Sequence, residues 1–61
     1  MTFEDTLKEA CKGNSTYQFI LGRMYENNMG IPTNSDMARY WYTQAAEQGD
    51  ALAIYHLDRI T

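Results

Sequence analysis

The sequence predicts an all-α fold in which four antiparallel helices stack as a short α/α superhelix. Apolar residues recur at the spacing of about 3.6 residues that marks amphipathic helices, and no run alternates apolar with polar residues as a half-buried strand would. The second half of the chain also repeats the first at an offset of about 36 residues, a period typical of stacked helix pairs. This offset aligns Ala10 with Ala46, Gly13 with Gly49, Asn14 with Asp50, Phe19 with Tyr55, Leu21 with Leu57, and Arg23 with Arg59.

The first helix is expected over residues 2–12. Thr2 and Asp5 have the spacing of a capping box, which satisfies backbone N–H groups at a helix start. The apolar face consists of Leu7, Ala10 and Cys11. On this face, Cys11 is expected to be a small buried hydrophobic residue rather than a nucleophile. Gly13 ends the helix, because glycine adopts the left-handed conformation that such an end needs.

The second helix is expected to begin at Asn14 or Ser15, either of which can cap it, and to run to about residue 27. One face of this helix carries Tyr17, Leu21, Met24 and Tyr25. The loop 28–33 follows, and its glycine and proline interrupt the helical pattern. Ile31 is expected to tuck under the helix pair.

The third helix is expected to begin at Asn34 or Ser35 and to run to about residue 48. Its apolar stripe contains Ala38, Trp41, Tyr42, Ala45 and Ala46. The alanines let a neighbouring backbone approach closely, while the aromatic rings fill the remaining volume. Gly49 ends this helix and Asp50 caps a fourth one. The apolar face of the fourth helix consists of Ala53, Leu57 and Ile60.

Composition and charge exclude several classes of protein. The chain has 61 residues and a net charge of −3, and it lacks the stripe of lysine and arginine that nucleic-acid binding requires. No stretch approaches the length of a membrane span, and residues 1–5 do not resemble the start of a signal peptide. The single cysteine cannot form an internal disulfide. We therefore expect a cytoplasmic protein that binds neither nucleic acid nor membranes.

Three segments stand in the order and spacing of a known repeat. The first is the Leu-Gly-x-x-Tyr element at residues 21–25, the second is Asn-Met-Gly-Ile-Pro at 28–32, and the third combines Trp-Tyr at 41–42 with Ala-Ala-Glu-Gln-Gly at 45–49. On these segments the chain resembles the Sel1-like repeat, a relative of the tetratricopeptide repeat. The resemblance implies a single domain over residues 1–61, with one complete repeat over about 15–50 flanked by two half repeats.

One departure from the family pattern bears on the end of this stack. Asp58 stands one repeat after Gly22, at a position where the family has a glycine that allows close helix contact. A charged residue there fits a terminal helix that no further repeat covers. Residues 51–61 are therefore expected to act as a cap.

The sequence contains no constellation of catalytic residues. His56 is the only histidine, and no cysteine or carboxylate stands at metal-ligand spacing from it. His56 is expected to be a surface residue of the fourth helix, and the acidic residues to be caps or solvated side chains. We expect no enzymatic activity, no metal and no cofactor.

The face opposite the apolar stripe is the candidate partner-binding surface. With Leu21 at the centre of the buried side, a rotation of about 100° per residue turns Phe19, Arg23 and Glu26 outward. In helical repeats the first helices of successive units line the concave groove, so Phe19 is expected beside Tyr55 and Arg23 beside Arg59. Aromatic rings beside arginines are typical of binding hot spots. The candidate binding residues are Phe19, Ile20, Arg23, Glu26, Asn27, Tyr55, His56 and Arg59.

Two functions remain open from the sequence. The first is a small interaction module that binds a partner protein or peptide through this groove, as an adaptor or as an inhibitor that occupies the partner's surface. The second is a structural role, as a self-associating homodimer or as a remnant of a longer repeat array with no separate ligand. A further alternative concerns single residues. Phe19 and Tyr55 then pack on each other as ordinary core residues, and Arg23 and Arg59 are solvated charges.

Overall fold

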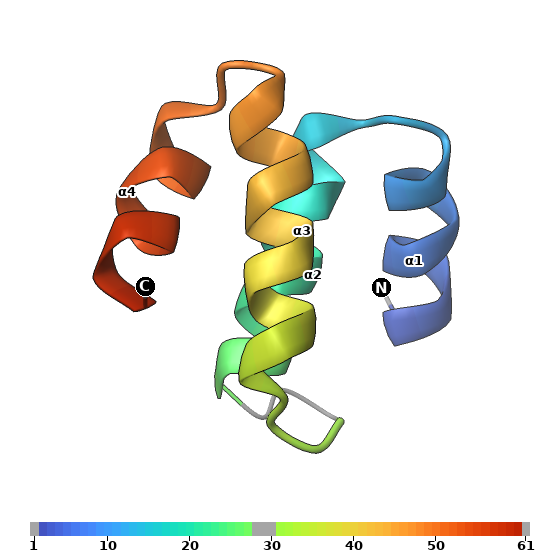
Figure 1. Ribbon diagram of the computed structural model, residues 1–61. Helices are drawn as coiled ribbons and strands as arrows, with labels where there is room; N and C mark the ends of the chain where they lie inside the picture. Colours follow the sequence, from blue (N-terminus) through green and yellow to red (C-terminus); the bar gives the residue numbers. More distant parts are fainter. Residues whose placement is uncertain (1, 28–30, 61) are drawn as a thin grey trace.

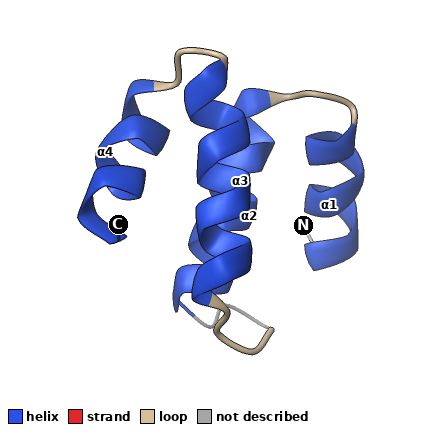
Figure 2. Ribbon diagram, in the orientation of Figure 1, coloured by secondary structure: helices blue, strands red, loops and turns tan. Residues whose placement is uncertain are grey.

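The computed structural model describes residues 2–27 and 31–60 of the chain. Within these ranges the chain forms four helices and no strand: α1 (Phe3–Cys11), α2 (Ser15–Asn27), α3 (Ser35–Glu47) and α4 (Ala51–Ile60). Figures 1 and 2 show α2 and α3 packed in the middle of the molecule, with α1 and α4 on either side of them. Each helix contacts the next one along the chain. The all-helical prediction is confirmed.

The two turns that follow the α1 and α3 helices are built from the same hydrogen bonds. Gly13 and Gly49 have φ angles of 94° and 89°, in the left-handed region that favours glycine. The next residue in each turn donates its N–H to a carbonyl five residues back, over 3.4 Å from Asn14 to Glu9 and 3.2 Å from Asp50 to Ala45. The repeat in the sequence therefore corresponds to two turns of the same geometry.

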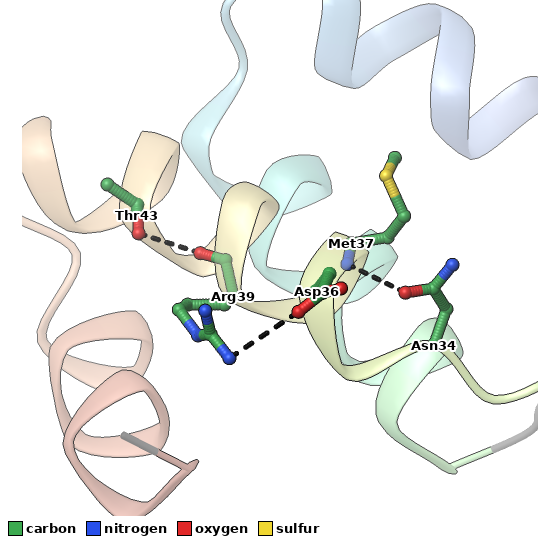
Figure 3. A network of polar contacts seen from close by, with 5 residues as sticks. All are labelled: Asn34, Asp36, Met37, Arg39 and Thr43. Carbon is green, nitrogen blue, oxygen red and sulfur yellow. Dashed lines mark hydrogen bonds and ion pairs between the residues drawn. The ribbon is translucent and has the colours of Figure 1, made fainter.

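Side chains cap the helix starts as the sequence predicts. The Asp5 N–H donates to Thr2 Oγ1 over 3.2 Å, and the Thr2 N–H donates to Asp5 Oδ2 over 3.5 Å, which completes the capping box of α1. Asn34 Oδ1 accepts from the Met37 N–H over 3.1 Å at the start of α3 (Figure 3). Asn14 and Asp50 accept in the same way at the starts of α2 and α4.

The core lies between α2 and its two neighbours. Leu21 of α2 is fully buried and forms a cluster with Ala10 of α1 and Trp41 of α3. Gly22 lets α3 approach closely, because a Cβ at this position would lie 2.6 Å from the ring of Tyr42. The partly buried residues packed against the cluster are Phe3, Leu7, Tyr17, Met24, Tyr25 and Met37.

The prediction that Cys11 is buried is wrong, because its side chain is exposed. The buried residues of α1 are Thr6 and Ala10, which lie four positions apart on the side that faces α2. Cys11 is rotated by about 100° from Ala10, out of that contact. Thr6 tolerates burial because its hydroxyl donates to the Thr2 carbonyl over 3.0 Å.

Candidate functional site

Three aromatic rings meet where α2, α3 and α4 come together. Phe19 of α2 lies 5.8 Å from the ring of Tyr42 and 5.2 Å from the ring of His56, between ring centroids. Tyr42 of α3 and His56 of α4 stack on each other at 5.5 Å, with 30° between their planes. Side chains therefore join α2 to α4 on one side of α3. These two helices are the first helices of the complete repeat and of the half repeat that follows it.

Glu26 connects the same three helices by polar contacts. Tyr42 donates its hydroxyl proton to Glu26 Oε1 over 2.6 Å, and His56 Nδ1 lies 3.8 Å from the same oxygen. Burial raises the pKa of the Tyr42 phenol, and the hydrogen bond to Glu26 and the charge of Glu26 raise it further. The positive charges of Arg23 and Arg59 act on the pKa of Tyr42 in the opposite direction.

Two exposed residues of α4 extend this cluster towards solvent. Tyr55 is the more informative of the two, because 61% of the residue is exposed. Its ring meets the His56 ring edge-on at 5.5 Å. The Arg59 guanidinium lies 5.8 Å from the centroid of the Tyr55 ring, and Arg59 Nη1 lies 3.4 Å from His56 Nδ1.

The predicted site residues fall into two groups. Arg23, Asn27, Tyr55 and Arg59 are exposed, whereas Phe19, Ile20, Glu26 and His56 are partly buried. We call these eight residues the interaction face. Phe19 reaches the fourth helix by contacting His56 rather than Tyr55, so the expected Phe19–Tyr55 contact is replaced by a chain of three rings.

His56 has a packing role that the sequence did not predict. Only 19% of its side chain is exposed, so the expectation of a plain surface histidine is wrong. Ala53, three positions earlier, is fully buried, and this spacing places both residues on the side of α4 that faces α3. The imidazole therefore packs against the Tyr42 ring instead of extending into solvent.

Two further residues at the helix junctions make contacts between helices that were not predicted from the sequence. Tyr42 was predicted as core filling, but it also carries the hydroxyl that binds Glu26. Gln18 is buried, donates to the Ala10 carbonyl over 3.0 Å and accepts from Gln48 over 2.9 Å, so it ties α1 and α3 to α2. A glycine inside a helix, such as Gly22, could have indicated that an aromatic ring packs there, whereas nothing in the sequence pattern pointed to Gln18.

The interaction face is an open surface. The described residues enclose no cavity, and they include no group of three or more histidine, cysteine or carboxylate side chains placed to hold a metal ion. In residues 2–27 and 31–60, no helix is both long and apolar enough to cross a membrane.

Comparisons with known proteins identify the family to which this arrangement of helices belongs. The Sel1 repeat family matches residues 15–50, which contain α2 and α3. Chitin synthase regulatory factor 3 of Schizosaccharomyces pombe is 40% identical over 42 residues, which cover 69% of this chain and 4% of that protein. The chain thus spans only a small part of that relative, and no solved structure matches it significantly. The Sel1 repeat match covers more than half of the chain and shows that the chain belongs to the Sel1 repeat family.

Proposed function

We propose that this chain is a cytoplasmic interaction module that binds a partner protein or peptide through the interaction face, as an adaptor or as an inhibitor that occupies the partner's surface. Sel1 repeats are generally units of protein interaction without catalytic activity. The observation that carries the proposal is the exposed ring of Tyr55 with the Arg59 guanidinium beside it. An aromatic ring and a guanidinium of this kind are typical hot-spot residues.

The cluster beneath these residues supports such a role. Phe19, Tyr42 and His56 hold α4 against the rest of the fold, so the exposed side chains of α4 are presented from a packed helix. Binding then orders few additional groups, which reduces its entropic cost. The name of the fission yeast relative describes a regulatory factor, and regulation through protein contact is compatible with this proposal.

A capture experiment with matched variants tests the proposal. We expect Tyr55→Ser to abolish the retention of a partner from native lysate, because it removes the exposed ring. Tyr40→Ser is the control, since Tyr40 is a tyrosine of similar exposure, 51%, on α3. It lies about 200° around the helix from Tyr42 and therefore away from the interaction face. Equal retention by both variants, each folded by circular dichroism, would contradict the proposal.

Self-association is the second candidate function. It is supported by two more exposed apolar residues on α4, Leu52 at 59% and Ile54 at 51%. A homodimer that buries them would show a sedimentation coefficient that rises with protein concentration. The same measurement on Leu52→Asp would then give the monomer value throughout. A wild-type chain that stays monomeric at high concentration would exclude this function.

A further inference from the structure

Arginine charges on the interaction face are not neutralised by ion pairs. In the described ranges, the arginine and lysine ion pairs join Lys12 to Glu9 over 3.2 Å and Arg39 to Asp36 over 3.6 Å. Figure 3 shows the second of these pairs on α3. Arg23 and Arg59 take part in neither pair, although both are exposed. They lie on α2 and α4, the two helices that form the face.

Glu26, the one acidic residue of the interaction face, is already bound. Glu26 Oε1 accepts the Tyr42 hydroxyl proton over 2.6 Å and lies 3.8 Å from His56 Nδ1. Its side chain is therefore turned into the junction of the three helices, and 21% of it is exposed. The face contains two arginines and one glutamate, and the exposed Asp58 adjoins Arg59 on α4. The face therefore presents two exposed guanidinium groups, while its own carboxylate is turned into the fold.

His56 connects the surroundings of the two arginines. Arg23 lies three positions before Glu26 on α2, and His56 Nδ1 lies 3.8 Å from Glu26 Oε1 and 3.4 Å from Arg59 Nη1. Arg59 is also held by the Tyr55 ring at 5.8 Å and by His56 at 3.4 Å. A guanidinium held against an aromatic ring keeps N–H donors free for the paired oxygens of a carboxylate.

We propose that the partner segment recognised by the interaction face is acidic, with aspartate or glutamate carboxylates bound by Arg23 and Arg59 beside the Tyr55 ring. This inference rests on the proposed function and adds the chemistry of the partner to it. A polypeptide is favoured over a nucleic acid, because the net charge of −3 opposes a polyphosphate backbone while two arginines suffice for isolated carboxylates.

Selection from a library of random linear peptides on the full chain tests this partner class. We expect the enriched peptides to be rich in aspartate and glutamate, and their affinity to fall as salt is raised. Arg23→Glu and Arg59→Glu are each expected to weaken a selected peptide by about tenfold or more, as the loss of a charge-assisted hydrogen bond implies. Arg39→Glu is the matched control and is expected to leave the affinity unchanged, because Arg39 lies on α3 and is paired with Asp36.

A second peptide selection, on a variant with the two arginine charges reversed, tests the same inference in the opposite direction. The double variant Arg23→Glu/Arg59→Glu replaces exposed residues, so we expect it to remain helical by circular dichroism. It is expected to enrich peptides rich in lysine and arginine. Enrichment of the same peptides by the wild type and the double variant would overturn the acidic partner class.

The outcomes separate this inference from the proposed function. If the enriched peptides lack carboxylates but lose binding in Tyr55→Ser, the acidic partner class is wrong and the interaction face stands. If no peptide is enriched, or if Tyr55→Ser leaves every enriched peptide bound, the proposed function fails and this inference fails with it. Loss of binding in Arg39→Glu as large as in Arg23→Glu would show a general charge effect and would also overturn the inference.

Discussion

Tyr42 is the residue on which three helices converge. Its ring packs over Gly22 of α2 and stacks on His56 of α4, while its hydroxyl donates to Glu26 over 2.6 Å. The side chain is fully buried, so this hydroxyl is shielded from solvent. One residue of α3 therefore both fills the core and aligns the two helices of the interaction face.

The raised pKa of the Tyr42 phenol predicts a loss of stability in alkali. The unfolded chain releases this proton near pH 10, whereas the folded chain holds it to higher pH. Above pH 10 the unfolded state therefore binds fewer protons than the folded state, and the free energy of unfolding falls as the pH rises. The slope is up to about 1.4 kcal/mol per pH unit for one such group.

Urea denaturation of the wild type and of Tyr42→Phe at neutral pH and above pH 10 measures this slope. At neutral pH we expect Tyr42→Phe to be less stable by about 1.5–3 kcal/mol, because Glu26 loses a hydrogen bond to its charged carboxylate. Above pH 10 the difference is expected to shrink, since the variant has no phenol to ionise at this position. Parallel pH profiles of the two proteins would contradict the raised pKa.

At the scale of the helices, the close approach of α2 and α3 depends on the absence of a side chain at Gly22. Gly-to-Ala changes inside helices usually stabilise them by about 0.5–1 kcal/mol. Here the added Cβ would meet the Tyr42 ring at 2.6 Å, and this ring is buried and cannot move aside freely. We therefore expect Gly22→Ala to destabilise the fold by about 1–3 kcal/mol instead.

A double-mutant cycle with Tyr42→Leu isolates this contact. In the Tyr42→Leu background the Gly22→Ala change is expected to lose most of its cost, because the ring that it meets is gone. Chemical denaturation of the four proteins gives the coupling energy. An equal cost of Gly22→Ala in both backgrounds, or a gain in stability in the wild type, would show that the ring does not limit the approach of α3.

The helices could be predicted from the sequence because their signals are local. Caps such as Thr2 and Asn34, and the glycines at the ends of α1 and α3, act within a few residues of their own positions. Burial on the outer helices could not be predicted in the same way. Cys11 and His56 were both assigned to the wrong environment, because the rotation of α1 and α4 is set by packing against other helices and not by local signals.

The candidate site was predictable in its composition and less so in its contacts. Helical arithmetic turned Arg23, Tyr55 and Arg59 outward, and all three are exposed. It also turned Phe19 and Glu26 outward, and both are partly buried. It did not identify the bond from Tyr42 to Glu26, since that contact joins residues from two helices. Sequence spacing predicts which side chains share a helix face, but the pairing of faces depends on packing between helices.

At the scale of the whole molecule, a chain of 61 residues has little stability to lose. The core of so small a domain is worth about 3–5 kcal/mol, and replacing a buried leucine by alanine costs about 2–5 kcal/mol. Leu21 is fully buried at the centre of the core cluster. We therefore expect Leu21→Ala to leave most of the chain unfolded at room temperature, with a weak helical signal by circular dichroism and no cooperative thermal transition.

Leu52→Ala is the matched control, because it removes the same atoms from a leucine that is 59% exposed. In the monomer this change is expected to alter the free energy of unfolding by no more than about 0.5 kcal/mol. A cooperative melt of Leu21→Ala near the wild-type temperature would contradict the packing of α1, α2 and α3 around this residue. A loss of stability in Leu52→Ala that grows with protein concentration would instead place Leu52 in a contact between two copies of the chain, because only an interface makes thermal stability depend on concentration.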